Sequence, residues 1–410
     1  MGTDPKWAAV IRNQSYFPLC LAGLNAVPIF FMISGLFTTL ATIEKKLSFV
    51  DVLRYCLARY ARLLAVLTPG LLWGLLRQRP FFFEGGLFCW GKVFSWVGMY
   101  GNYNSEMKYW WIDGATLHNW SVVVDFQATV VLIVFTSLVK RIFGEGKLRR
   151  AYVCALVTSV LLRANIVLKD KCLNLVEVLG VWHPGVSFLL GTNDGQAFME
   201  QVYDAPYGKF VVDTGNCVMR NDDHMHNYAV KSYLPLHMRI APFFVGALFA
   251  TRLKTPTEDV KSSFAYRIAS IWIIASLFLP LDVDSLPPPA ALLFLEIFGH
   301  VLLSAAVATV TYYTLTPQAH ACHAPITKRL MSLPFFKFAG QLSPWIYALH
   351  WPILFEVLRF VKFEPSILAG LALSLAVLAA SAILAYFMVR NVDPILSRAL
   401  KIIKGHPKAN

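Results

Sequence analysis

Two stretches of the sequence are too long and too apolar to belong to a soluble domain. Residues 17–43 hold no charged side chain, and neither do residues 366–389. A helix of about 20 apolar residues crosses the roughly 30 Å hydrocarbon core of a bilayer, so each stretch is long enough to span one. The whole chain is 57% hydrophobic and only 15% charged, which excludes an ordinary soluble protein.

Other apolar runs carry only one or two ionisable residues each and raise the prediction to about nine membrane helices. The runs cover residues 17–43, 57–76, 117–138, 151–168, 233–251, 266–281, 289–315, 338–358 and 366–389. We therefore expect an all-α fold, a polytopic transmembrane helical bundle that crosses its membrane several times.

The predicted organisation is one membrane domain with short ends. We expect an external N-terminal remnant (1–16), a membrane domain (17–390) and a basic cytoplasmic tail (391–410). Two long outer loops, at about 77–116 and 169–232, interrupt the helices. The first is rich in Trp, Tyr and Phe, which suits a segment at the membrane interface.

The net charge of +13 does not predict a nucleic-acid partner, because the basic residues lie at the ends of apolar runs and form no single stripe. Their placement instead predicts how the helices are oriented in the membrane. Most Lys and Arg become cytoplasmic when the inner segments are 44–62, 139–150, 252–267, 316–337 and 390–410. This orientation places the amino terminus outside, so we expect that a first helix upstream of this sequence is missing.

Arg59 and Arg62 are the first candidate binding residues. They lie three positions apart on one helix face, at the predicted cytoplasmic mouth. Such a pair can bind the phosphates of an anionic donor in bidentate fashion. Anchoring by the positive-inside rule explains the same spacing equally well.

Asp125 and His350 are candidate catalytic residues because each lies inside an otherwise apolar run. A charge at mid-helix costs about 2.5 to 3.5 kcal/mol on insertion scales, so a buried acid there suggests function. Counting residues from the helix ends puts both groups at a similar depth, where they could form an orienting pair. The alternatives are an ion pair of Asp125 with Arg239 or Arg163, and a hydrogen-bonded core histidine.

Two further patterns complete the candidates. Ser34 and Gly35 form a small-residue patch that allows close helix packing, about 26 Å into its helix and therefore near the arginine pair. His224 and His226 lie in the second outer loop, without Cys or Glu at ligand spacing. We therefore expect no metal site.

Taken in order, these segments resemble the acyltransferase 3 family, and within it the nose-resistant-to-fluoxetine-like branch. The family's Val-Asp-x-Phe-Phe-x-x-Ser-Gly is similar to residues 27–35 with Pro28 for Asp, and its Arg-x-x-Arg to Arg59 and Arg62. Its Trp-Ser-x-x-x-Glu-x-Gln is similar to residues 120–127, with Asp125 for Glu. Two later motifs of the family are also similar to parts of this chain. The first is similar to Tyr233, Pro235, Arg239, Pro242 and Gly246, and the second to Leu342, Ser343, Tyr347, Leu349 and His350.

The resemblance implies a bundle of about ten helices that transfers an acyl group from acyl-CoA to a hydroxyl of a carbohydrate or lipid acceptor. It implies that Arg59 and Arg62 face the coenzyme, with Ser34 and Arg239 as further binding residues. The expected partners are the lipid bilayer, acyl-CoA and that acceptor, and the location is the plasma membrane or an endomembrane.

One departure keeps the enzymatic assignment open. The family's proposed catalytic histidine lies on its first helix, and this chain has no histidine before His118. A non-catalytic relative that moves lipids or small molecules is therefore the alternative. A membrane-bound O-acyltransferase of the other family, suggested by His350 and Asn119 alone, ranks third. The acceptor, acyl chain length and oligomeric state have no sequence signal.

Overall fold

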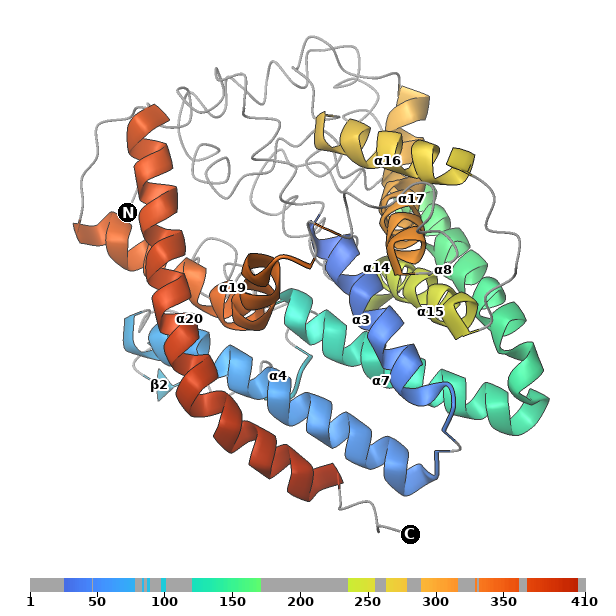
Figure 1. The fold of residues 1–410 in the computed structure, drawn as a ribbon, viewed down its shortest axis with the longest axis horizontal. Helices are drawn as coiled ribbons and strands as arrows, with labels where there is room; N and C mark the ends of the chain where they lie inside the picture. The colour runs from blue at the N-terminus through green and yellow to red at the C-terminus, as the bar shows by residue number, and fades with distance from the viewer. Residues whose placement is uncertain are drawn as a thin grey trace. The chain divides into compact units, whose positions relative to one another are not determined.

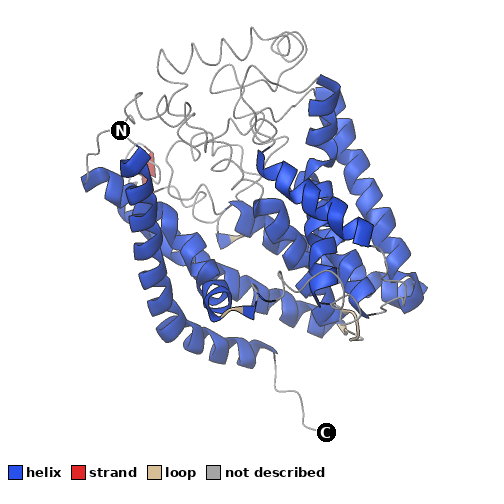
Figure 2. Cartoon of the chain, turned by 45° about the horizontal axis from the view of Figure 1, so that its top comes forward, coloured by secondary structure: helices blue, strands red, loops and turns tan. Residues whose placement is uncertain are grey.

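Almost every residue described in the structure is helical (Figure 2). The computed structural model describes residues 26–45, 47–77, 83–84, 87–88, 97–100, 120–170, 235–254, 263–278, 289–315, 329, 332–360 and 367–404. The prediction of an all-α membrane protein is confirmed. The small exception is a pair of two-residue antiparallel strands, β1 (Phe83–Glu84) and β2 (Leu87–Phe88), in the first predicted outer loop.

The helices follow one another along the chain as labelled in Figure 1. They are α3 (Ala26–Thr42), α4 (Phe49–Arg77), α7 (Trp120–Phe143), α8 (Leu148–Asp170), α14 (Leu236–Arg239), α15 (Ala241–Lys254), α16 (Ser263–Phe278), α17 (Pro289–Leu315), α19 (Pro334–Phe360) and α20 (Ile367–Lys404), with the 3-10 turn η4 (Glu145–Lys147). The described part of every predicted membrane run falls on one or two of these helices. Residues predicted as the basic tail continue α20 as far as Lys404.

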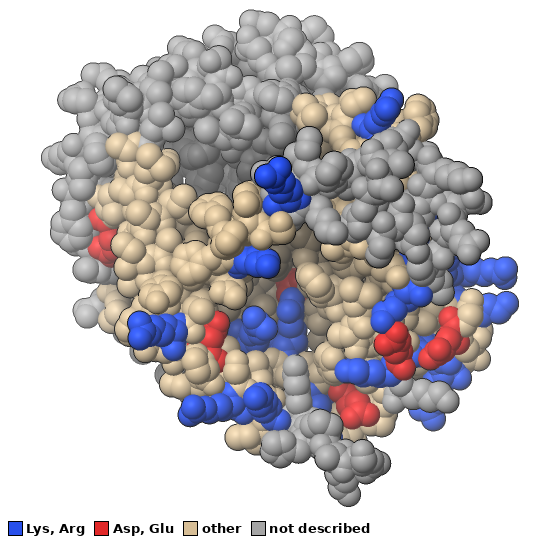
Figure 3. All heavy atoms as spheres, in the orientation of Figure 1, with Lys and Arg blue, Asp and Glu red and all other residues tan. Residues whose placement is uncertain are grey.

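Four of the described helices are long and apolar enough to cross a membrane, fewer than the runs predicted from the sequence. These segments are Trp120–Phe143, Glu145–Leu168, Phe294–Leu315 and Ala372–Ile403, and two shorter apolar helices are Ala26–Thr42 and Phe264–Ala275. Large apolar side chains on such helices face outward, among them Phe37, Ile271 and Ile383, each more than 60% exposed. The view in Figure 3 accordingly shows a described surface on which most residues carry no charge. Such a surface suits contact with lipid.

The chain divides into two units, each described separately. Unit 1 comprises Met1–Lys45 and Val131–Pro325, and unit 2 comprises Lys46–Val130 and Ile326–Asn410. Helix α7 contributes its first half to unit 2 and its second half to unit 1.

Unit 1 is built on the close approach of α3 and α15. Gly35 faces the backbone of Phe243, and Gly246 faces the backbone of Met32, so neither site has room for a Cβ atom. Small residues allow two membrane helices to pack backbone against backbone in this way. The rings of Phe31 and Phe243 stack beside the contact with centroids 5.0 Å apart.

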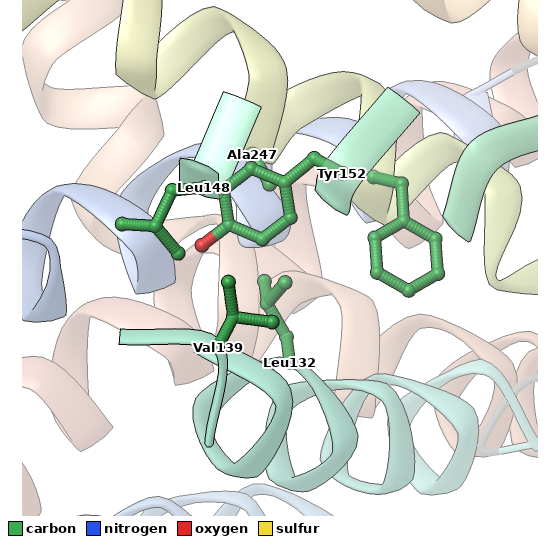
Figure 4. Packing of buried hydrophobic residues seen from close by; sticks show 6 residues of the cluster. Leu132, Val139, Leu148, Tyr152 and Ala247 are labelled. Carbon is green, nitrogen blue, oxygen red and sulfur yellow. The ribbon is translucent and has the colours of Figure 1, made fainter. Parts of the chain in front are cut away.

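A second core of unit 1 joins α7, α8 and α15 around Tyr152. Figure 4 shows Leu132 and Val139 of α7 pointing toward the Tyr152 ring, with Leu148 beside it. The Tyr152 hydroxyl forms a hydrogen bond of 2.7 Å with Thr136, which satisfies a polar group inside the apolar cluster.

Segments predicted to be cytoplasmic meet at one end of unit 1. Lys140, at the end of α7, donates to the backbone oxygens of Ile43 (2.6 Å) and Lys45 (3.0 Å) just after α3. Lys254, at the end of α15, bonds Glu44. Lysine donors at a helix end bind the carbonyls that lack partners within the helix.

Unit 2 packs α4, α19 and α20 together. Its core holds Leu342 and Trp345 of α19 against Ala385 of α20. Indole donors also reach acids on other helices: Trp345 to Asp393 (3.1 Å) and Trp73 to Glu356 (2.8 Å). Each pair satisfies two polar groups that an apolar environment would otherwise leave costly.

The glycine contact generates a stability prediction. We expect Gly246→Ala to lower the free energy of unfolding by about 1 to 3 kcal/mol, because the added methyl collides with the Met32 carbonyl oxygen. Thermal unfolding of the purified protein in detergent measures the effect. Gly299→Ala in α17 is the matched control, since nothing lies within 4 Å of its added Cβ. Equal losses in both variants would contradict this packing.

The start of α4 generates a pH prediction. Ser48 and Asp51 form a capping box: the Ser48 N–H and hydroxyl donate to Asp51 Oδ2 (3.0 and 2.7 Å), and the Asp51 N–H donates to Ser48 Oγ (3.2 Å). These hydrogen bonds from Ser48 lower the pKa of Asp51. The stabilisation is therefore present above the unfolded pKa of about 3.9 and is lost as pH falls through the lower folded pKa.

Amide hydrogen exchange in the first turn of α4 tests this cap. Asp51→Asn should speed exchange near neutral pH, and wild type and variant should converge in acid, below the lowered folded pKa of Asp51, where both side chains are neutral. Ser48→Ala should speed exchange at both pH values, because the hydroxyl does not titrate. An Asp51→Asn effect that persists unchanged in acid would rule out the carboxylate as the source.

Candidate active site

Arg59 and Arg62 lie on α4, in the fourth turn after its cap. Both project from one face of the helix, as their spacing predicts. Arg62 is exposed, whereas the Arg59 side chain is 30% exposed. The two arginines therefore have different surroundings, and of the two only Arg59 reaches a buried acid among the described residues.

That acid is Asp125 of α7. Arg59 Nη2 lies 2.5 Å from Asp125 Oδ2, and the Asp125 side chain is 0% exposed. A carboxylate in an apolar helix is stable only when paired, and the guanidinium supplies a charge-assisted hydrogen bond. The ion pair joins α4 to the first half of α7.

A second polar contact lies one turn earlier on α7. The hydroxyls of Ser121 and Tyr347 are 2.5 Å apart, which brings α19 to the same helix. Ser121 and Asp125 are four residues apart and therefore share a face of α7. The arginine motif, the Trp-Ser motif and the histidine motif thus meet within unit 2.

His350 follows Tyr347 by one turn of α19, with ring centroids 5.7 Å apart. Its Nδ1 lies 2.7 Å from the Tyr347 carbonyl oxygen and 3.2 Å from that of Ile346. A carbonyl oxygen only accepts, so Nδ1 must carry the proton and donate it. In the neutral ring, Nε2 is then the nitrogen that can accept a proton, as a general base requires.

Asp125 and His350 do not form the orienting pair suggested by their depth. Asp125 binds Arg59, and His350 donates to backbone carbonyls of its own helix. The alternative partners proposed for Asp125 are also engaged elsewhere. Arg163 bonds Glu296 at 2.7 Å, and Arg239 Nη1 lies 3.2 and 3.3 Å from the two ring nitrogens of His300.

A short segment, Val97–Tyr100, packs beside these residues. The Tyr60 hydroxyl donates to the Val97 carbonyl (2.8 Å), and the Gln127 amide donates to the Met99 carbonyl (2.8 Å). Met99 is buried and has φ 55, in the left-handed region. A buried backbone carbonyl is costly unless a hydrogen-bond donor reaches it. Tyr60 and Gln127 supply them.

Two predicted binding residues belong to unit 1. Ser34 is buried on α3 next to Gly35, and Arg239 is 2% exposed at the end of α14. The structure describes them as parts of a packed helix contact and of the Arg239–His300 pair.

Most residues that were considered as metal ligands lie outside those that the structure describes. His224 and His226 lie outside them, as do most of the two predicted outer loops. Among the residues that the structure describes, no group of three or more His, Cys, Asp or Glu is positioned to hold a metal ion.

Sequence reasoning assigned no role to Ser121, Tyr347, Tyr60 or Gln127. The four-residue spacing of Ser121 and Asp125, and the three-residue spacing of Tyr347 and His350, are signals that could have singled out the first two. Together the site offers a base, two hydroxyls and two guanidinium groups, which is what acyl transfer between a phosphorylated donor and an alcohol requires.

Comparison with known proteins identifies the family. The profile of the acyltransferase 3 family, described as an acyltransferase domain, matches residues 2–386. Searches of the curated proteins and of the solved structures found no match. Because the matched region covers most of the chain, the family prediction made from the motifs is confirmed. The chain belongs to the acyltransferase 3 family and is a membrane acyltransferase by that membership.

Proposed function

We propose that this protein transfers an acyl group from acyl-CoA to a hydroxyl of a carbohydrate or lipid acceptor. The observation that supports it is the Arg59–Asp125 ion pair, one turn from the Ser121–Tyr347 hydrogen bond that leads to His350. The reaction takes place in a plasma membrane or endomembrane, with the bilayer as the protein's surroundings.

The donor end of the site is the arginine pair. Arg62 is exposed and can meet the phosphates of the coenzyme directly. Asp125 accepts a hydrogen bond from Arg59, so the Arg59 guanidinium, next to Arg62, is held in place before the donor binds. Preorganised cations bind an anion at a lower entropic cost than flexible ones.

His350 is the base in this proposal. Its Nε2 takes the proton of the acceptor hydroxyl as the oxygen attacks the thioester carbonyl. The new C–O bond forms, the C–S bond breaks, and the CoA thiolate leaves with the proton returned by His350. The hydroxyls of Ser121 and Tyr347 are 2.5 Å apart, so one donates to the other. The hydroxyl that accepts keeps its own proton and is a candidate donor to the oxyanion formed in between.

The donor role predicts a selective defect in Arg62→Ala. We expect KM for acetyl-CoA to rise about 10- to 100-fold with little change in kcat, the effect of losing a charge-assisted hydrogen bond. S-acetylpantetheine, which lacks the phosphates, should react equally well with wild type and variant. Acetyl-donor-dependent labelling of membranes that contain the protein measures both.

Two further variants make that test specific. Arg141→Ala removes another exposed arginine in a predicted cytoplasmic segment and should leave both donors unaffected. Arg59→Ala should also destabilise the protein, by about 3 to 5 kcal/mol, because it leaves the buried Asp125 carboxylate unpaired. If Arg62→Ala weakened acetyl-CoA and S-acetylpantetheine alike, the arginine would not be reading phosphate.

Orientation gives a second prediction for the donor site. A cysteine placed at exposed position 54, in a variant whose seven native cysteines are replaced, should react with a membrane-impermeant maleimide only from the cytosolic side. The reason is that cytosolic acyl-CoA must reach α4 near Arg59 and Arg62. Labelling from the opposite side would exclude a cytosolic donor at this site.

A further inference from the structure

We propose that Asp125 and Thr129 form a subsite that binds a hydroxyl group of the acceptor. The inference rests on the proposed function and deepens it, because it assigns acceptor binding to two named side chains of α7. The donor residues and the base lie elsewhere on the same unit, on α4 and α19.

The first observation is the half-used carboxylate of Asp125. Oδ2 bonds Arg59, while Oδ1 is buried and has no hydrogen-bond partner within the part of the chain that the structure describes. The side chain is 0% exposed. A buried acceptor without a donor is costly, more so when charged, so this oxygen is suited to receive an O–H group.

The second observation is the unusual state of the Thr129 hydroxyl. Threonine hydroxyls on helices of this protein commonly donate to a carbonyl four residues earlier: Thr68 to Leu64, Thr136 to Leu132, Thr309 to Ala305, Thr311 to Val307 and Thr314 to Val310. Thr129 Oγ1 makes no such bond, nor any other within the described residues, although the side chain is only 2% exposed. Its hydroxyl is thus a buried polar group without a hydrogen-bond partner within the described residues.

The two groups are neighbours on the helix. Asp125 and Thr129 are four residues apart on one face of α7, with Ser121 one turn before them. The Ser121 hydroxyl is hydrogen-bonded to Tyr347, and one oxygen of Asp125 is hydrogen-bonded to Arg59. Among the described residues, the remaining carboxylate oxygen and the Thr129 hydroxyl are thus two consecutive polar atoms of this face that lack a hydrogen-bond partner.

The chemistry of the subsite favours an alcohol. The Arg59 guanidinium donates to Oδ2 of the Asp125 carboxylate, and a carboxylate oxygen such as Oδ1 is suited to accept a hydrogen bond. A thioester carbonyl offers no O–H, whereas a hydroxyl can donate to Asp125 and accept from Thr129 at once. Since His350 takes the reacting proton, the hydroxyl held here is a second one on the same molecule. The subsite therefore selects acceptors with several hydroxyls, such as a sugar.

Acceptor kinetics test the subsite through Thr129→Val, which removes the hydroxyl at nearly constant volume. The probes are methyl β-D-glucopyranoside and cyclohexanol, with acetyl-CoA as donor and the full chain in lipid nanodiscs. We expect KM for the glucoside to rise about three- to tenfold, as for one lost hydrogen bond, with KM for acetyl-CoA and for cyclohexanol unchanged. Thr129→Ser should restore the wild-type value.

The matched control is Thr136→Val on the same helix, whose hydroxyl bonds Leu132 and Tyr152. It should leave KM for the glucoside unchanged. The proposal is overturned if Thr129→Val leaves KM for the glucoside unchanged or raises KM for acetyl-CoA instead. It is also overturned if Thr129→Val weakens cyclohexanol as much as the glucoside.

Infrared difference spectroscopy separates this inference from the proposed function. Adding methyl β-D-glucopyranoside should shift a carboxylate band that is absent from Asp125→Asn, and Thr129→Val should reduce the shift. A shift without any acyl transfer would leave the subsite standing and remove the proposed reaction. Transfer without a shift would remove the subsite alone.

Discussion

The Arg59–Asp125 ion pair is the interaction on which the candidate site depends. A carboxylate buried on an apolar helix is expensive unless a cation approaches it, and 2.5 Å from Oδ2 to Nη2 is such an approach. The pair holds α4 against the first half of α7 and engages Oδ2 of Asp125. Charge compensation therefore decides both where these helices meet and what the second carboxylate oxygen can bind.

Polar groups elsewhere follow the same rule with different partners. In unit 1, Arg163 spreads its guanidinium over the Glu296 carboxylate, the Glu296 carbonyl and the Met238 carbonyl, each at 2.7 Å. In unit 2, Tyr60 and Gln127 satisfy carbonyls of the Val97–Tyr100 segment. Buried polar groups are cut off from solvent, so side chains take over the hydrogen bonds that water supplies at a surface.

The contact between α3 and α15 in unit 1 depends instead on glycines, which have no side chain. Gly35 and Gly246 let the α3 and α15 backbones touch, which increases dispersion contact where the hydrophobic effect offers little. Close packing of the two helices therefore explains the glycine of the Ser-Gly motif at position 35. The binding role of the neighbouring Ser34 stays a prediction.

The sequence alone determined the class of protein, the family and the positions of the helices, because uncharged runs and short motifs are local signals. It also singled out Arg59, Asp125 and His350 as residues in unusual surroundings. Only the tertiary structure decided their partners: Arg59 for Asp125, backbone carbonyls for His350, and Ser121 for Tyr347. Residue spacing places a side chain on a helix face, but which helix comes to that face depends on the packing of the whole bundle.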